Sequence, residues 1–459
     1  MTETVAIPLW LLLLILVFAA ISALTHVLVP SVRWFFRRRM ERALARLNAR
    51  LDRPIAPFKL MERPDMIARL VHDPQVMAAV VDYAQSNGVP ETVALQKARA
   101  YAREIVPGFS AVVYFGFATR AARLLSGLFY RVRVGRVADT LAGIDREATV
   151  VFIMNHRSNM DYVLVTWLVA DRSALSYAVG EWARVWPLSG LVRAMGAYFI
   201  RRRAQTALYR RVLARFVQMA TAEGTTQAIF PEGGLSLDGR VGVPKLGLLG
   251  YIVQGFDPRG RDVSFVPVGL SYDRVIEDRM LVEAGQTGVR RFRARPGSIL
   301  GFVWRMIWRK IIRRFPGFGT AAADFGAPVS LRAFLAEHPG PVEEQTAALG
   351  ARLMREVRAC VPVLPVPLVA AALIDGPVPR AMLDSRIAAL TAQLAASGAR
   401  LHLPDTSAAT MAEGLRNLAL RGIVADTGGA LRAAPGMGPL LAFHAAPVRQ
   451  LLEPSLPPD

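Results

Sequence analysis

His156 and Asp161 have four residues between them and could together remove a proton from an alcohol. An imidazole can take the proton from an alcohol, while a carboxylate fixes the imidazole tautomer and stabilises the imidazolium. No other histidine of the six has an aspartate at that spacing. Alone the spacing is a weak signal, because short patterns recur by chance.

The two side chains can face each other only if a turn separates them, since residues five apart on one helix are about 140° out of register. The strand-like run Thr149–Met154 precedes the pair, and the helical run Tyr162–Ala170 follows it. Strand, turn and helix would supply that geometry. Ser158 and Asp161 also have the spacing of a helix cap, so a purely structural role stays open.

A second segment ends in arginines. The apolar run Ala197–Ile200 leads directly into Arg201, Arg202 and Arg203. Guanidinium groups bind phosphate through two parallel hydrogen bonds, so Arg201 and Arg202 are candidate phosphate ligands. A solvated charge run at the start of the next helix is the alternative.

A third segment is glycine-rich. Phe230 and Pro231 precede Glu232, Gly233 and Gly234, which permit close approach of backbone to a ligand. Farther along the chain, Arg240 and Lys245 could add phosphate contacts, although a plain turn after a strand explains the same residues. A fourth segment, Phe265–Tyr272, contains Pro267 and reads by itself as a buried strand.

The region from 147 to 275 alternates short strands with helices, which favours an α/β domain with a mainly parallel sheet. The expected strands are Thr149–Met154, Ala197–Ile200, Thr226–Phe230 and Val263–Leu270, and the expected helices are Tyr162–Ala170, Gln205–Glu223 and Lys245–Gln254. Residues 50–125 and the Ala/Leu-rich tail from about 366 read as helical accessory regions.

The N-terminal run Val5–Val29 has no charged residue and is long enough to cross a hydrocarbon layer of roughly 30 Å. A basic group follows it, at Arg33, Arg37, Arg38, Arg39, Arg42 and Arg46. This pattern predicts a retained transmembrane helix with the rest of the chain cytoplasmic, rather than a cleaved signal peptide.

The 459 residues carry a formal charge of +20, and the sequence pI is near 11. Anionic lipid, an acidic soluble substrate and nucleic acid all suit that charge, and the expected anchor favours the first two. The single cysteine, Cys360, excludes an internal disulfide and a cysteine metal cluster.

Residues 298–315 predict a basic amphipathic helix. Trp304, Ile307, Trp308 and Ile311 follow helical spacing on one side, with cations mostly elsewhere. The pattern fits a helix on a membrane surface and equally a surface helix packed on the domain.

Taken in order, the four segments resemble the glycerolipid acyltransferase superfamily. Within it, Asn155–Tyr162, Gly196–Arg202, Asp324–Val329 and the end near Leu441–His444 resemble the glycerol-3-phosphate acyltransferase branch. The similarity runs from about residue 60 to the C-terminus. Asn159 and Leu235 depart from the branch, which commonly has histidine and arginine at these positions.

The resemblance implies an acyltransferase-type αβ domain, and the apolar run and the helical patterns described above complete a division into four expected regions. These are an N-terminal transmembrane anchor (1–32), a basic juxtamembrane and helical accessory region (33–125), the αβ acyltransferase domain (126–335) and a C-terminal helical region (336–459). It also implies that His156 and Asp161 are catalytic. The expected substrate-binding residues are Arg157, Ser158, Arg201, Arg202, Glu232, Gly233, Gly234, Arg240, Lys245 and Pro267.

The implied reaction moves an acyl group from acyl-CoA or acyl carrier protein to the sn-1 hydroxyl of glycerol 3-phosphate, making lysophosphatidic acid for phospholipid biosynthesis. Backbone N–H groups near His156 would stabilise the oxyanion. No metal or bound cofactor and no nucleic acid partner are expected, and the location would be a bacterial inner membrane with anionic phospholipid.

Two alternatives remain at this point. Because Leu235 removes a candidate phosphate contact, lysophosphatidate, dihydroxyacetone phosphate or another lysolipid could be the acceptor. A non-catalytic membrane-associated protein that binds lipid or nucleic acid would explain the charge, but it leaves the His–Asp pair unexplained.

Overall fold

The computed structural model describes residues 7–24, 29–135, 137–169, 172–180, 188–201, 206–289, 301, 304–306, 308–310, 312 and 317–453. The chain divides into two compact units, Met1–Pro54 and Ile55–Asp459. The predicted domain boundaries at 32, 125 and 335 are not tested by this division and stay a prediction.

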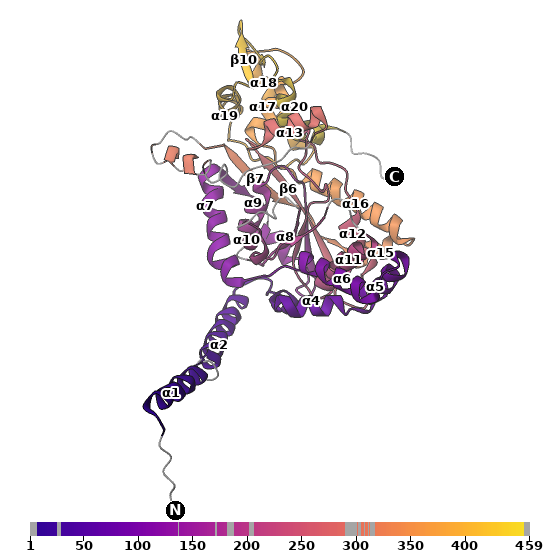
Figure 1. Cartoon of the computed structure of the whole chain (residues 1–459). Helices are drawn as coiled ribbons and strands as arrows, with labels where there is room; N and C mark the ends of the chain where they lie inside the picture. Colours follow the sequence, from indigo (N-terminus) through magenta and orange to yellow (C-terminus); the bar gives the residue numbers. More distant parts are fainter. Residues whose placement is uncertain are drawn as a thin grey trace, which may run out of the picture. The chain divides into compact units, whose positions relative to one another are not determined.

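The first unit contains two helices, α1 (Leu9–Ala23) and α2 (Val29–Asn48) (Figure 1). The sequence predicted one transmembrane helix across the apolar run from Val5 to Val29, and this prediction is wrong. α1 has 15 residues, which gives a length of only about 22 Å, well under a hydrocarbon layer of roughly 30 Å. α2 is longer, but arginines occur along most of it.

Across the described part of the chain, no helix combines the length and the apolar character needed to cross a membrane. The cytoplasmic location predicted for the rest of the chain depended on a transmembrane helix at Val5–Val29. Without this helix, that reason for the location no longer holds.

The second unit is built on an eight-stranded sheet with the order β1-β7-β6-β2-β5-β3-β4, and β8 pairs with β6. β2 pairs in parallel with both β5 and β6, and β3 pairs in parallel with β4 and β5. β6 pairs antiparallel with β7 and β8, so the sheet is mixed. The strands are β1 (Arg131–Val134), β2 (Thr149–Met154), β3 (Ser176–Val179), β4 (Tyr198–Phe199), β5 (Gln227–Ile229), β6 (Val263–Tyr272), β7 (Thr320–Phe325) and β8 (Val329–Ser330).

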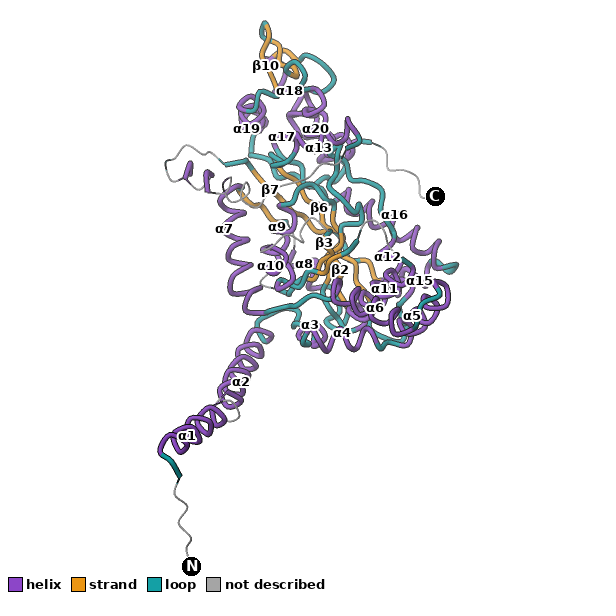
Figure 2. Tube along the Cα trace, in the orientation of Figure 1, coloured by secondary structure: helices purple, strands orange, loops and turns teal. Residues whose placement is uncertain are grey.

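Helices cover both faces of this sheet, which explains why β2 is buried along its whole length. Val151 and Ile153 belong to one core, with residues of α4, α5, α6, α11, α12, α15 and α16. Val150, Phe152 and Met154 belong to the other, with residues of α7, α9 and α13. Figures 1 and 2 show these helices around the central strands.

The helices of the second unit up to the end of β6 include every helix that the alternating pattern predicted. They are α3 (Pro57–Leu60), α4 (Arg63–Val71), α5 (Pro74–Asn87), α6 (Glu91–Ile105), the π-helical segment Val112–Ala118, α7 (Thr119–Phe129), α8 (Val137–Ala142), α9 (Met160–Val169), α10 (Leu188–Ala194), α11 (Ala207–Ala222) and α12 (Gly247–Gln254).

The C-terminal part of this unit is helical, as the sequence indicates, with a small antiparallel sheet of order β10-β11-β9. Its core is formed mainly by α17, α18, α19 and α20. The remaining elements are α13 (Asp278–Thr287), α15 (Leu331–Glu337), α16 (Val342–Ala359), α17 (Pro365–Leu373), β9 (Val378–Pro379), α18 (Arg380–Ala396), α19 (Ser407–Leu420), β10 (Val424–Thr427), β11 (Ala430–Ala433) and α20 (Gly438–Leu452).

Gly269 in β6 is where the sheet meets the start of the C-terminal part. A Cβ atom at this position would lie 2.2 Å from the carbonyl carbon and oxygen of Cys360. We therefore expect Gly269→Ala to lower the free energy of unfolding by about 3 kcal/mol, because backbone atoms on both sides would have to move.

Gly127→Ala is the control for that measurement. Gly127 lies on the exposed side of α7 with nothing within 4 Å of its virtual Cβ, so alanine should leave stability unchanged or raise it by up to about 1 kcal/mol. Urea unfolding of both variants measures the difference in stability between them. Equal unfolding midpoints for Gly269→Ala and Gly127→Ala would contradict the expected loss of stability at Gly269.

Candidate active site

The predicted turn lies at the carboxyl end of β2. Residues 155–159 connect the strand to α9, which begins at Met160. The side-chain amide of Asn155 donates to the carbonyl of Leu270 (3.0 Å) and accepts from its N–H (2.7 Å). Asn155 therefore extends the pairing of β2 with β6 by a side chain and fixes where the turn starts.

His156 and Asp161 meet within this turn. Nδ1 of His156 lies 2.9 Å from Oδ2 of Asp161, and both side chains are buried. The same oxygen accepts the backbone N–H groups of Arg157 (2.7 Å) and Ser158 (3.0 Å), and Oδ1 accepts the hydroxyl of Tyr272 (2.7 Å). With the Nδ1 proton directed at Asp161, Nε2 is the nitrogen left to accept a proton.

Aromatic rings hold the imidazole in place. The ring of Phe230 stacks on His156 at a centroid distance of 4.3 Å, and Tyr162 meets it edge-on at 5.4 Å. The imidazole thus has its tautomer set by Asp161 and its plane set by Phe230.

Glu232 contacts the same turn from the glycine-rich segment. Its Oε1 accepts the backbone N–H of His156 at 2.9 Å. Burial raises the pKa of Glu232 to about 7, although hydrogen bonds from the backbone of His156 and Gly242 act in the opposite direction. Gly233 has a φ of +66°, and its virtual Cβ would meet the Lys245 side chain at 2.8 Å. Gly234 is buried.

The raised pKa of Glu232 has a consequence for stability. Between about pH 4.5 and pH 7 the folded chain keeps a proton that the unfolded chain has lost, so stability is fully present at the acidic end and falls as the pH rises. Glu232→Gln keeps an oxygen that can accept from His156 and removes the titration. Relative to this variant, we expect the native chain to lose up to about 3 kcal/mol across that window.

Urea unfolding of the two proteins at pH 5, 6 and 7 checks this expectation. A difference that stays constant with pH would show that the ionisation of Glu232 is not coupled to folding.

Arg157 and Ser158 point away from the imidazole. Arg157 is buried, donates to the carbonyl of Gly239 and lies over the ring of Phe443 at 4.7 Å. Its Nε and Nη2 are buried without a hydrogen-bond partner among the described residues, and burial lowers its pKa. Ser158 donates to Glu277 at 2.9 Å.

Two of the four predicted phosphate ligands, Arg201 and Arg240, are paired with carboxylates. Arg201 forms two hydrogen bonds with Glu104, of 2.8 and 2.7 Å, and these bonds raise its pKa. β4 precedes Arg201 and lies three strands from β2, or about 14 Å away at the usual strand spacing. Arg240 pairs with Glu453 at the end of α20. Arg202 lies outside the described residues.

Lys245 and Pro267 complete the predicted set. Lys245 is exposed, and its backbone N–H donates to the carbonyl of Pro231 at 2.8 Å, which closes the glycine-rich loop. Pro267 lies in β6 opposite Ile153, one residue before the end of β2. The structure thus brings His156, Asp161, Glu232 and their neighbours together, while Arg201 and Arg240 are bound elsewhere. The functional roles of all these residues stay predictions.

Several residues at the site were not predicted. Tyr272 was recognised only as the end of the fourth segment, yet its hydroxyl binds Asp161. Glu277 accepts from Ser158 and from the backbone and side chain of Asn159. Phe443 packs on Arg157 from α20. These contacts join positions more than 100 residues apart, and no local pattern signals them.

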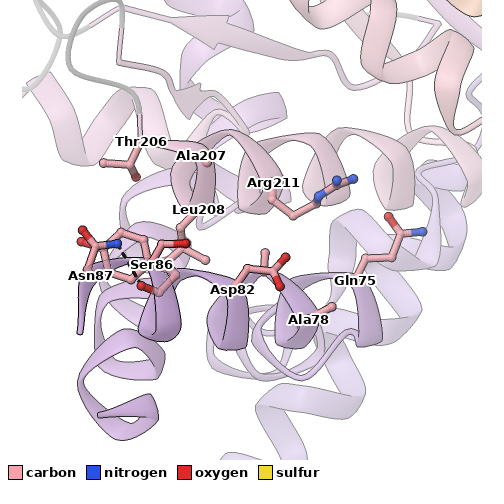
Figure 3. Close-up of a pocket in the computed structure, with 11 residues that line it drawn as sticks. Gln75, Ala78, Asp82, Ser86, Asn87, Thr206, Ala207, Leu208 and Arg211 are labelled. Atoms are coloured by element: carbon pink, nitrogen blue, oxygen red, sulfur yellow. Dashed lines mark hydrogen bonds between the residues drawn. The ribbon is translucent and has the colours of Figure 1, made fainter. Parts of the chain in front are cut away.

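A cavity of about 670 Å³ lies between α5 and α11 (Figure 3). Asp82 on α5 and Arg211 on α11 both line it, and none of its lining residues is in the predicted site. In the described part of the chain, no group of three or more His, Cys, Asp and Glu side chains could hold a metal ion.

Two family models match the chain. The acyltransferase model matches residues 138–271, which include His156, Asp161, the glycine-rich segment and most of β6. The model of the glycerol-3-phosphate acyltransferase C-terminal region matches residues 304–442. The chain therefore contains an acyltransferase domain, followed by a region similar to the C-terminal region of glycerol-3-phosphate acyltransferases.

Curated relatives agree with that placement. The chain is 27% identical over 364 residues to a glycerol-3-phosphate acyltransferase of Xanthomonas campestris, with 74% of this chain and 39% of the relative covered. It is 28% identical over 368 residues to one of Pseudomonas entomophila, with 76% and 43% covered. The chain thus spans about two fifths of the length of the curated relatives it matches.

Among solved structures, the chain is similar to the 1-acyl-sn-glycerophosphate acyltransferase of Thermotoga maritima. The sequence identity is 17%, the TM-score is 0.34, and the match covers 65% of this chain and 98% of the other.

Proposed function

We propose that this protein transfers a fatty acyl group from acyl-CoA or acyl carrier protein to the sn-1 hydroxyl of glycerol 3-phosphate, forming lysophosphatidic acid. The observation that carries the proposal is the buried His156–Asp161 pair, in which Nε2 is left to act as a base. The match to the acyltransferase model over the same residues supports it.

In the proposed reaction, Nε2 of His156 takes the proton from the acceptor hydroxyl while its oxygen attacks the thioester carbonyl. The tetrahedral intermediate then collapses, the carbon–sulfur bond breaks, and the thiolate takes the proton back from the imidazolium. The products are an ester and a free thiol, so atoms and charge balance. No metal or bound cofactor is required, because Asp161 supplies the charge that stabilises the imidazolium.

The backbone N–H groups expected to hold the oxyanion are engaged otherwise. Those of Arg157 and Ser158 donate to Asp161, that of His156 donates to Glu232, and that of Asn159 donates to Glu277. The donor that stabilises the oxyanion therefore has to come from another part of the site, or from a rearranged turn.

Glycerol 3-phosphate is preferred over lysophosphatidate because the C-terminal region of glycerol-3-phosphate acyltransferases matches residues 304–442. Its relatives carry the same name. Leu235 stands where this branch commonly has an arginine that could bind phosphate. The identity of the acceptor is therefore the part of the proposal to test first.

The site of action would be the surface of an anionic phospholipid membrane. The net charge of +20 supports this, as do Trp304 and Trp308, which are 69% and 56% exposed. Lys310 beside them donates to the carbonyls of Gly127 and Leu128 at the end of α7. Sedimentation with vesicles of anionic phospholipid tests this part, and protein that stays in the supernatant would contradict it.

The proposed activity is tested with labelled palmitoyl-CoA and the whole chain, offered glycerol 3-phosphate or lysophosphatidate in separate reactions. Lysophosphatidate made in the first reaction supports the proposal. Product in the second reaction alone would move the assignment to another acceptor. If neither reaction gives product, both are repeated with an acyl carrier protein as the acyl donor. Absence of product with this donor as well would reject the proposal.

A further inference from the structure

A second cavity, of about 310 Å³, lies between the end of β6, the start of α13 and the end of α19. It is lined by Arg274, Ile276, Glu277, Asp278, Arg279, Met280, Leu420 and Arg421. Three arginines and two carboxylates therefore face one small volume.

Glu277 connects this cavity to the catalytic turn. Its carboxylate lines the cavity and accepts hydrogen bonds from Ser158 (2.9 Å) and from the backbone N–H of Asn159 (2.7 Å). Ser158 is two residues from His156, so their Cα atoms are at most about 7.6 Å apart. A ligand in the cavity would thus lie next to the segment that holds the base.

One of the arginines is already neutralised. Arg421 donates to Oδ1 of Asp278 at 2.7 Å, and His444 lies 2.9 Å from Oδ2 of the same carboxylate. Burial alone would raise the pKa of Asp278, but these hydrogen bonds outweigh it and hold the pKa below its usual range. Asp278 therefore stays ionised and cancels the charge of Arg421.

The other two arginines have no such partner. Across the described residues, neither Arg274 nor Arg279 has an ion pair within 4 Å, and Nε of Arg274 is buried without a hydrogen bond. Arg274 lies over the ring of Phe318 at 4.3 Å, which fixes its plane. Arg279 donates to the carbonyl of Arg421 at 3.2 Å. Against the single carboxylate of Glu277, the cavity keeps an excess of positive charge.

We propose that the cavity lined by Arg274, Arg279 and Arg421 binds a phosphate group of a substrate. A phosphate would supply the anion and the acceptor lone pairs that the planar guanidinium of Arg274 lacks. This inference rests on the proposed function for the identity of the substrate, and it assigns the phosphate to a site other than Arg201 and Arg240.

Two substrates could supply that phosphate. Glycerol 3-phosphate carries it on the same three-carbon chain as the reacting hydroxyl, whereas acyl-CoA carries its phosphates beyond the pantetheine arm. Arg274→Gln separates them in steady-state kinetics. A KM for glycerol 3-phosphate raised about tenfold or more, with the KM for acyl-CoA unchanged, identifies the acceptor phosphate. The reverse pattern identifies the donor phosphates.

Arg210→Gln, an exposed arginine on α11, is the matched control and should leave both KM values unchanged. If Arg274→Gln also leaves both unchanged while the protein remains folded, the inference is overturned.

Phosphate binding can also be measured without enzymatic turnover, by thermal unfolding. Inorganic phosphate should raise the melting temperature of the native chain, and this shift should be lost in Arg274→Gln and kept in Arg210→Gln. An equal shift in all three proteins would overturn the inference. If the native chain transfers no acyl group but shows the arginine-dependent shift, the proposed function fails while the phosphate site stands.

Discussion

Replacing His156 with alanine is expected to lower acyl transfer to glycerol 3-phosphate by about a thousandfold or more, while the protein stays folded. The loss follows because the imidazole is the proposed base, and a positioned base contributes roughly two to four orders of magnitude. The fold should survive, since Asp161 keeps its hydrogen bonds from Arg157, Ser158 and Tyr272. Initial rates with labelled palmitoyl-CoA, together with thermal unfolding, measure both parts.

His402→Ala is the matched control for this variant. His402 also binds an aspartate, with Nε2 at 2.5 Å from Oδ2 of Asp324, but it belongs to the C-terminal part of the chain. Its loss should leave the rate within a small factor of normal. Near-normal turnover in His156→Ala would mean that another group is the base.

Asp161→Asn is expected to cost nearly as much activity and some stability as well. An asparagine oxygen can still accept from the turn, but it no longer carries the charge that stabilises an imidazolium, and it no longer enforces the Nδ1–H tautomer. The expected fall in kcat is about 10³- to 10⁴-fold. Because three donors then share a neutral oxygen, the free energy of unfolding should fall by about 1–3 kcal/mol.

Tyr272→Phe is a milder change than Asp161→Asn and serves for comparison with it. It removes one hydrogen bond, to Oδ1, and leaves the three contacts of Oδ2, so kcat should fall by only about tenfold. If Tyr272→Phe and Asp161→Asn reduced kcat equally, the role of Asp161 would be to hold the turn rather than to stabilise charge on His156.

The parts of the fold that follow local patterns could be predicted from the sequence. Thr149–Met154 is apolar and β-branched and forms β2 as expected, and the end of this strand with the following turn explains how His156 reaches Asp161. β7 was missed because its sequence, Thr320–Phe325, is rich in alanine and carries little strand signal.

The errors and omissions have physical causes. Hydropathy measures how apolar the run from Val5 to Val29 is, but it does not reveal that α1 ends at Ala23. Arginines indicate phosphate binding only if no carboxylate of the protein pairs with them. Arg240 pairs with Glu453, which lies 213 positions later in the sequence, so the sequence around Arg240 does not reveal this pair. Contacts of this kind depend on the complete fold.

The way α20 reaches the catalytic segment limits how this protein can be divided. Phe443 packs on Arg157, Gln450 exchanges two hydrogen bonds with the backbone of Val241, and Glu453 holds Arg240. α20 therefore supports the segments that carry Arg157 and Arg240, on the side away from the imidazole. An excised piece limited to residues 138–271 would lack this support, and chimaeras between relatives should exchange α20 and the glycine-rich segment as a pair.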